Sequence, residues 1–194
     1  MLFAVAAVLG LLLVAGACAI FDEDQLSDDE RAAFTVDGNT ATMTGVIDSS
    51  TPDAVRDLLA ENPDVDTIVM VDVPGSADDE ANLEASRLVR AAGLTTHARS
   101  DSVLASGGVD FYLAGATRTY EPGAQFGVHS WATGDGAEGI DVPRDDEQHA
   151  LYLNYYAEMG IDADFYWFTL EAAPADDIHW MTEAELTKYA FVTS

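Results

Sequence analysis

Apolar and polar residues alternate along the chain in a way that predicts strands and helices in turn. Residues 34–36 and 40–47 alternate as strands do, and Asp37-Gly38-Asn39 between them is typical of a hairpin turn. A nearly continuous apolar run rich in β-branched residues follows at 67–73, as expected for a buried parallel strand. The same reasoning predicts further short strands at 94–98, 117–120, 126–129 and 191–192.

Segments with helical spacing of apolar residues separate these strands. The first begins at Thr51-Pro52, a capping hydroxyl followed by proline at the first helical position. Because short connections join strands to helices, the pattern predicts an α/β domain with a mostly parallel sheet. Ligands bind beyond the carboxyl ends of such strands, where the pattern places Pro74-Gly75-Ser76 and a turn at Ser106. Further helices are predicted at 79–92, 107–113, 145–159, 162–172 and from Thr182.

The N-terminal residues predict export, with the protein either anchored to the membrane of the cell envelope or free in the periplasm or outside the cell. Residues 1–20 contain no charged side chain and have the length of a signal peptide or a membrane anchor. The end of this segment, Ala15-Gly16-Ala17-Cys18, resembles a bacterial lipobox, in which Cys18 would be lipidated. Residues 21–32 are acidic and without periodicity, which suits a short tether. The remainder, 33–194, is expected to form one domain.

The charge balance limits the possible partners. The chain has 35 acidic and 8 basic residues and a net charge of −27, so it would repel nucleic-acid phosphates. Solubility or adaptation to high salt would explain this surface, and a cationic substrate would still be attracted. Cys18 is the only cysteine, and no histidine cluster of metal-binding spacing occurs, so neither a metal nor another cofactor is expected.

The stretch from Asp101 to Trp131 holds the residues with the strongest catalytic pattern. Ser106 precedes Gly107-Gly108, so backbone N–H groups at a helix N-terminus would lie beside its hydroxyl. The following strand ends at His129, a candidate general base. A small residue in a tight turn and a structural histidine would give the same pattern. The only lysine is Lys188, in the terminal helix, which argues against a Ser–Lys mechanism.

These segments together resemble the ClpP/crotonase-like fold and, within it, exported ClpP-like serine proteases. The resemblance covers about 40–192 and rests on order and spacing. It is carried by Val73-Pro74-Gly75-Ser76, Ala105-Ser106-Gly107-Gly108, Leu113-Ala114-Gly115, Arg118 to Pro122-Gly123-Ala124, Gly127-Val128-His129 and Met181 to Leu186 with Tyr189.

The resemblance implies roles for particular residues. Ser106 would be the nucleophile and His129 the base, the N–H groups of Ser76 and Gly107 would bind the oxyanion, and Gly75 would contact the substrate. Ser76 stands where the family has glycine. Ile178 occupies the family's aspartate position, so Asp177, one residue earlier, is the candidate third triad member, with its neighbour Asp176 also considered.

Two functions follow as expectations. The first is an exported hydrolase acting on peptide or other acyl bonds, which the resemblance further implies is often a ring-shaped homo-oligomer. The second is a catalytically inactive relative that binds peptides or an envelope partner, which the departures at Ser76 and Asp177 favour. An acyl-CoA enzyme of the crotonase type is a third reading, disfavoured because the acidic surface suits a polyanionic cofactor poorly.

Overall fold

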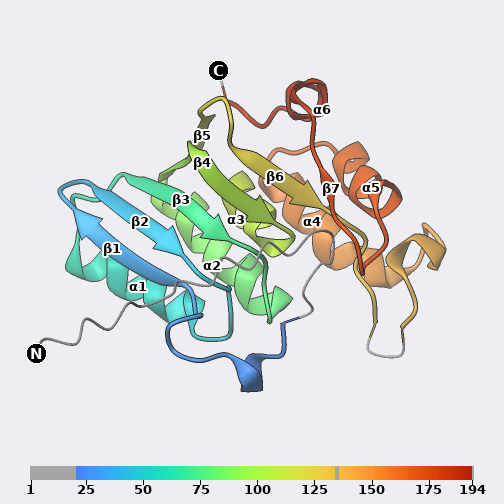
Figure 1. Ribbon diagram of the computed structural model, residues 1–194, viewed down its shortest axis with the longest axis horizontal. Helices are drawn as coiled ribbons and strands as arrows, with labels where there is room; N and C mark the ends of the chain where they lie inside the picture. Colours follow the sequence, from blue (N-terminus) through green and yellow to red (C-terminus); the bar gives the residue numbers. More distant parts are fainter. Residues whose placement is uncertain (1–20, 134–135, 194) are drawn as a thin grey trace, which may run out of the picture.

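The computed structural model describes residues 21–133 and 136–193 as a sheet flanked by helices (Figure 1). The N-terminal segment 1–20, with Cys18, lies outside the described residues. The strands are β1 (Ala33–Asp37), β2 (Thr40–Thr44), β3 (Thr67–Val73), β4 (Thr95–Ala105), β5 (Thr117–Tyr120), β6 (Gln125–Val128) and β7 (His179–Trp180). The helices are α1 (Thr51–Glu61), α2 (Asp79–Ala92), α3 (Gly107–Leu113), α4 (Ala150–Glu158), α5 (Ala163–Ala172) and α6 (Glu183–Lys188).

The sheet is mostly parallel, as the sequence predicts. Its strands follow the order β1-β2-β3-β4-β6-β7, and β5 pairs with the first half of β4. The pairs β2–β3, β3–β4, β4–β5 and β4–β6 are parallel, whereas the edge pairs β1–β2 and β6–β7 are antiparallel. Helices α1, α2 and α3 lie together on one face of the sheet, and α4 and α5 lie beyond its β6–β7 end (Figure 1).

Strand β4 is longer than predicted and reaches the residue before Ser106. Its pairing with β3 jumps from Met70↔Ala98 to Asp72↔Val103, so residues 99–102 bulge out of the ladder. The Ser102 hydroxyl closes this bulge, donating to the carbonyl of Met70 at 2.6 Å and accepting the N–H of Arg99 at 2.8 Å. The polar bulge interrupts the apolar pattern, which is why the sequence indicates a strand only to Ala98.

The C-terminal part differs from the prediction in three places. Residues Glu147–His149 form a 3-10 turn, and helix α4 begins only at Ala150. The sequence pattern predicts a loop over 174–180, but His179 and Trp180 form the short strand β7. The prediction of a strand at 191–192 is wrong, because Ala190 has a φ of 54° and turns the chain inward. The Phe191 ring is fully buried instead, 5.2 Å from that of Phe126.

Helix termini mostly follow the sequence signals. Helix α6 has a capping box in which Thr182 and Glu185 satisfy each other's backbone N–H groups. Thr51 is not the cap of α1; Ser50 holds that position, and the Thr51 hydroxyl accepts the N–H of Asp48 instead.

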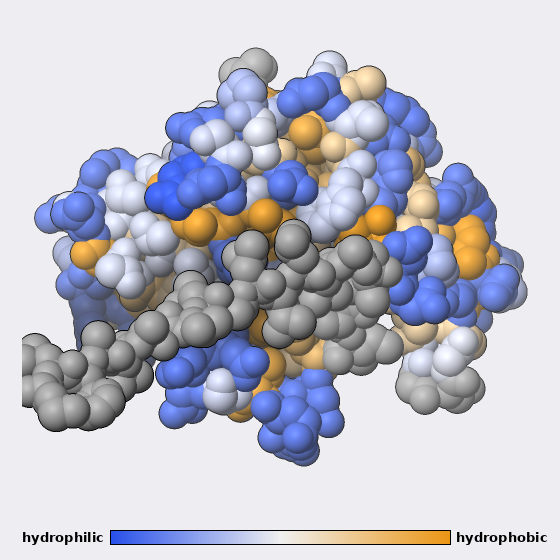
Figure 2. Space-filling model, viewed as in Figure 1, coloured by the Kyte–Doolittle hydropathy of each residue, from blue (hydrophilic) through white to orange (hydrophobic). Residues whose placement is uncertain are grey.

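Residues 21–32, predicted to be a tether, pack against the domain. Glu23–Gln25 form a 3-10 turn, and Arg31 pairs with the buried carboxylate of Asp48. The backbone of Arg31 also forms a β-bridge with Val46. On the face shown in Figure 2, hydrophilic residues dominate the outer parts of the described surface, in keeping with the acidic composition, and apolar residues form a broken band across the middle.

Candidate active site

Three neighbouring parallel strands end at one edge of the sheet and bring the candidate residues together. The register pairs Val73 of β3 with Leu104 of β4, and Ala105 of β4 with Gly127 of β6. The residues that follow these strand ends are therefore neighbours in space: Gly75 and Ser76 after β3, Ser106 after β4 and His129 after β6.

A cavity of about 310 Å³ opens at this edge, and it includes Ser76, Ser106, Gly107 and His129 among its lining residues. The other lining residues are Phe21, Ala77, Asp79, Val109, Asp110, Val128, Trp131, Ala132, Tyr152, Tyr156, Tyr166, Thr169 and Ala175. The volume lies at the lower end of the range for small-molecule and peptide-side-chain pockets. Four sequence-predicted site residues thus share one cavity.

Ser106 has a strained backbone at the junction of β4 and α3. Its φ of 51° and ψ of −128° are unusual for a residue with a side chain. The turn is fixed on both sides: the Ser106 N–H donates to Gly127 O at 2.9 Å, and its carbonyl accepts the N–H of Val109 at 2.8 Å. A strained strand-to-helix turn is how hydrolases present a nucleophilic serine, although Leu104 replaces the first glycine of the usual motif.

The backbone N–H groups of Ser76 and Gly107 are the candidate oxyanion donors. Gly107 is the first residue of α3, so its N–H has no acceptor within the helix, and no described residue accepts from either N–H. Ser76 has no positive φ, so its replacement of glycine causes no backbone strain. A side chain on Gly107 would meet Ser76, because a Cβ there would lie 2.4 Å from the Ser76 Oγ.

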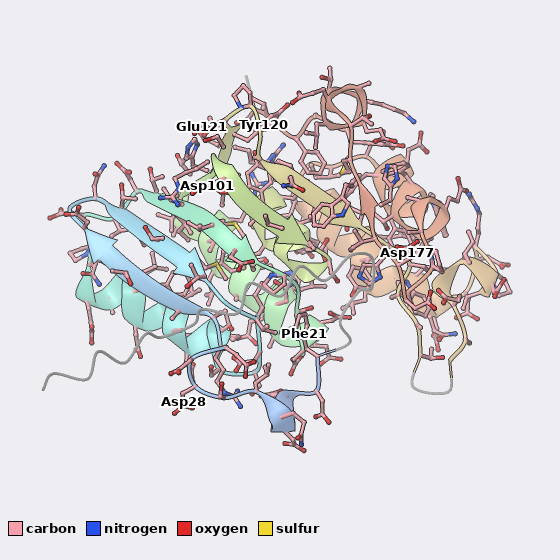
Figure 3. The ribbon with its side chains drawn as sticks, in the orientation of Figure 1. Phe21, Asp28, Asp101, Tyr120, Glu121 and Asp177 are labelled. Atoms are coloured by element: carbon pink, nitrogen blue, oxygen red, sulfur yellow. The ribbon has the colours of Figure 1, made fainter. Side chains whose placement is uncertain are left out.

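Gly75 allows the chain after β3 to approach the nucleophile closely. A Cβ at this position would lie 3.4 Å from Ser106 Cβ and 3.1 Å from the Phe21 ring. Phe21, from the N-terminal segment, therefore lies near the Ser106 turn and lines the cavity (Figure 3).

His129 is held in a defined orientation. Its Nδ1 lies 2.7 Å from the carbonyl oxygen of Ser130, and a carbonyl only accepts hydrogen bonds, so Nδ1 carries the proton in the neutral ring. Burial lowers the pKa of His129, while the Ser130 carbonyl and the charges of Asp79 and Glu138 act in the opposite direction. The imidazole is therefore neutral at pH 7, with its lone pair on Nε2, as a general base requires.

The structure does not bring Asp177 into this cavity. Asp177, labelled in Figure 3, and its neighbour Asp176 are exposed in the loop before β7, and neither lines the cavity. The carboxylate of Asp177 accepts the N–H of its neighbour Ile178 at 2.8 Å.

Sequence reasoning missed the carboxylates that do lie at the site. Asp79, the first residue of α2, is exposed at the cavity and accepts hydrogen bonds from Ser76 Oγ at 2.6 Å and Tyr152 Oη at 2.6 Å. Asp110 of α3 is 8% exposed and accepts from Tyr156 Oη at 2.5 Å. Asp110 is the only acid in the otherwise apolar segment from Gly107 to Leu113, and this pattern is a sequence signal for a buried functional carboxylate. No comparable pattern distinguishes Asp79 from the other acids among the 35 of the chain.

The remaining histidines have structural surroundings. The acidic residues 145–147 before His149 predict an exposed helix there, but His149 is fully buried, and its Nδ1 lies 2.6 Å from Tyr166 Oη. That prediction was wrong because the aromatic side chains of α5 cover the start of α4. His97 Nδ1 lies 2.8 Å from Thr119 Oγ1, and His179 Nε2 lies 3.0 Å from a Glu185 carboxylate oxygen.

The described residues contain neither a membrane-spanning helix nor a metal-binding cluster. No helix within 21–133 or 136–193 is both long and apolar enough to cross a bilayer. The same residues contain no group of three or more His, Cys, Asp or Glu side chains placed to bind a metal ion.

Comparison with solved structures identifies the fold. Two mutants of the 1510-N membrane-bound stomatin-specific protease match with TM-scores of 0.56 and 0.52 at 17% and 16% sequence identity. The matches cover 79% and 81% of this chain and 76% and 75% of the protease chains. The second of these structures is a complex with a substrate peptide. Pseudomonas aeruginosa DspI also matches, at 17% identity over 54% of this chain and 55% of its own, with a TM-score of 0.39.

The chain has a ClpP/crotonase-like fold, which confirms the fold expected from the sequence. No protein-family model and no curated protein sequence matches the chain. At such low identity the structural likeness establishes the fold alone, so the function is argued from the cavity itself.

Proposed function

We propose that this chain is a serine-type hydrolase that cleaves peptide bonds, with Ser106 as nucleophile and His129 as general base. The observation that carries the proposal is the conformation of Ser106. A strained serine at a strand-to-helix turn is costly to the fold, about 1–3 kcal/mol, and is typical of functional sites. Here it shares a cavity with a neutral, oriented histidine.

The reaction follows from these positions. Ser106 Oγ attacks the carbonyl carbon of the scissile bond while its proton passes to Nε2 of His129. The N–H groups of Gly107 and Ser76 stabilise the negative charge that develops on the carbonyl oxygen. The tetrahedral intermediate collapses, His129 returns the proton to the leaving amine, and the acyl group stays on Ser106. Water, deprotonated by His129, then hydrolyses this ester and restores both side chains.

In this proposal Asp177 is not the third member of a catalytic triad. The carbonyl of Ser130 orients the His129 ring, and the negative charges of Asp79 and Glu138 stabilise the imidazolium that forms during the reaction. Glu138 is itself fixed, because both of its carboxylate oxygens accept the N–H of Ala175, at 3.3 and 3.1 Å.

Labelling with a fluorophosphonate probe tests the proposal, because such probes react with activated serines. We expect wild type to be labelled, the S106A variant to lose labelling, and S100A, an exposed serine of β4, to keep it. Folded wild-type protein that is not labelled, or is labelled equally after S106A, would overturn the assignment.

A catalytically inactive, peptide-binding protein is the second candidate. The specific observation in its favour is that the candidate triad aspartate, Asp177, lies outside the cavity and accepts the N–H of Ile178. Peptide binding to wild type without labelling or turnover would establish this alternative.

We further propose that residues 1–20 direct export and hold the protein at the cell envelope, either as a lipoprotein through Cys18 or as an uncleaved anchor. A C18S variant that loses incorporation of labelled fatty acid and leaves the membrane fraction would support the lipoprotein form.

We also propose that the protein forms a homo-oligomer, as the family resemblance implies. Light scattering of the purified protein measures the mass of the assembly directly.

A further inference from the structure

The cavity beside Ser106 carries negative charge without a cationic counterpart. Asp79 and Asp110 both line it, whereas none of the eight lysine and arginine residues of the chain, all within the described part, is among its lining residues. Neither carboxylate forms an ion pair with another described residue. A ligand entering this cavity therefore meets an uncompensated negative field.

Asp110 is the deeper of the two carboxylates. It is 8% exposed, and among the described residues only the Tyr156 hydroxyl donates to its carboxylate, at Oδ1. Its Oδ2 accepts no hydrogen bond from another described residue, it is not a fully enclosed atom, and Asp110 lines the cavity. A buried carboxylate with an unfilled acceptor is costly unless a cation or donor completes it.

The electrostatics of Asp110 agree with this geometry. Burial raises its pKa to about 7, the charge of Asp79 adds to that rise, and the Tyr156 hydroxyl opposes it. A bound cation would favour the ionised carboxylate and relieve part of the cost of burying it.

The rest of the lining suits a long side chain with a charged end. The rings of Tyr152 and Tyr166 stack at 5.9 Å with an angle of 14° between their planes, and Trp131 and Tyr156 add further aromatic surface. Aromatic faces attract ammonium and guanidinium groups and cover their aliphatic stems.

The position of Asp110 relative to the nucleophile Ser106 indicates which part of a substrate enters the cavity. Asp110 lies four residues after Ser106, at the end of the first turn of α3, which is about 6 Å along a helix axis. Lysine and arginine carry their charge at the end of stems of four and three methylene groups, so the charged end of such a side chain lies at a similar distance from its own backbone.

We propose that this cavity selects substrates with a lysine or arginine side chain at the residue that supplies the scissile carbonyl, with Asp110 pairing with its charged end and Asp79 adding to the field. The inference rests on the proposed hydrolase activity for its placement. It goes beyond that activity by naming the substrate class and the residues that choose it.

Binding separates this inference from the catalytic proposal. In an S106A background, calorimetry would compare peptides that differ only at the selected residue: lysine, arginine, norleucine or glutamate. We expect the lysine and arginine peptides to bind at least 10-fold more tightly than the norleucine peptide. The glutamate peptide should bind least tightly of the four. Equal binding of lysine and norleucine peptides, or no binding of either, would overturn the inference whether or not wild type is labelled by fluorophosphonate.

Variants assign the selectivity to the two carboxylates. D110N keeps the acceptor for Tyr156 and should reduce the lysine-over-norleucine ratio about 10-fold, and D79N should reduce it less because Asp79 is exposed. D57N, which removes one exposed charge of α1, should leave the ratio unchanged. Circular dichroism confirms folding of each variant. A ratio unchanged in both folded D110N and D79N, or lowered equally in D57N, would contradict the assignment.

Discussion

Nδ1 of His129 lies 2.7 Å from the main-chain carbonyl oxygen of the next residue, Ser130. In a Ser-His-Asp triad a carboxylate accepts the hydrogen bond from the Nδ1–H group of the histidine. This carboxylate fixes the tautomer of the ring and stabilises the imidazolium. Among the described residues, the carbonyl fixes the tautomer, while Asp79 and Glu138 favour the charged ring through space. Orientation and charge stabilisation are thus supplied by different groups.

This separation predicts a particular pH dependence. The rate of fluorophosphonate labelling should rise with pH through a midpoint below 6.5, the ordinary pKa of histidine, because burial lowers the pKa of His129 and only the neutral ring accepts the Ser106 proton. D79N and E138Q each remove a charge that raises this pKa, so each should move the midpoint further down. D57N serves as the control and should leave it in place. A midpoint above 6.5, or one unmoved by both variants, would contradict the assignment.

The strained backbone of Ser106 predicts an unusual order of stability among substitutions. Glycine adopts positive φ without cost, so S106G should be about 1 kcal/mol more stable to urea unfolding than S106A. At Ser100, an exposed residue of β4 without a positive φ, the order should reverse, with the alanine variant the more stable. If S106A proves the more stable of its pair, the turn is not strained.

The sequence predicted the sheet and its flanking helices because their apolar periods are regular. The run at 67–73 forms the parallel strand β3, in which Ile68, Met70 and Val73 are buried and the residues between them are half-buried or exposed. The apolar period does not predict the β4 bulge, where the Ser102 hydroxyl replaces hydrogen bonds of the strand ladder. It also wrongly predicts a strand at Phe191, where the positive φ of Ala190 prevents an extended chain. Both failures are local polar or backbone effects that hydrophobic patterns do not report.

The candidate site was predicted in part for a similar reason. Ser106 and His129 stand out because small residues and a strand end surround them, and the sheet register brings them to one cavity. Asp79, Asp110 and Glu138 reach the site through tertiary packing, from three segments whose acids look alike in an acidic chain. Asp177 was chosen by counting along the chain, which does not report that the residue is exposed.

The contact between Gly107 and Ser76 predicts a rescue. In G107A the new Cβ would lie 2.4 Å from Ser76 Oγ and 2.7 Å from Ser76 Cβ, so the variant should lose about 2 kcal/mol or more of unfolding free energy. Adding S76G removes both of these atoms, whereas Asn82 Nδ2, which is also 2.7 Å from the new Cβ, stays in place, so the rescue should be partial. The double variant should therefore be more stable than the sum of the single effects by about 1 kcal/mol or more.

The neighbouring glycine supplies a matched control for that rescue. A Cβ on Gly108 would lie 2.2 Å from the backbone carbonyl oxygen of Val73, which a side-chain deletion leaves in place. G108A should thus be destabilised with or without S76G. Urea unfolding of the six proteins gives both couplings, and equal rescue of G107A and G108A would show that Ser76 is not the obstacle.

Asp110 predicts a conflict between stability and the proposed selectivity. Its pKa is raised from 3.8 to about 7 in the folded state, so folded protein binds more protons than unfolded protein between these values. Stability from this group therefore falls as pH rises from about 4 to about 7, and the full cost remains above that range. The groups facing it, Asp79 and the tyrosines Tyr152 and Tyr156, stay in place in the D110N variant.

D110N should consequently be more stable than wild type at pH 8, by at most about 4 kcal/mol, and the gain should shrink as the pH is lowered and vanish near pH 4. Urea unfolding at pH 4, 6 and 8 measures the trend, with D57N as the control for loss of one exposed charge from a very acidic chain. A gain equal at all three pH values, or one matched by D57N, would mean that Asp110 is not a buried acid with a raised pKa. If the gain appears together with loss of the lysine preference, the fold sacrifices stability at Asp110 to keep a negative charge beside Ser106.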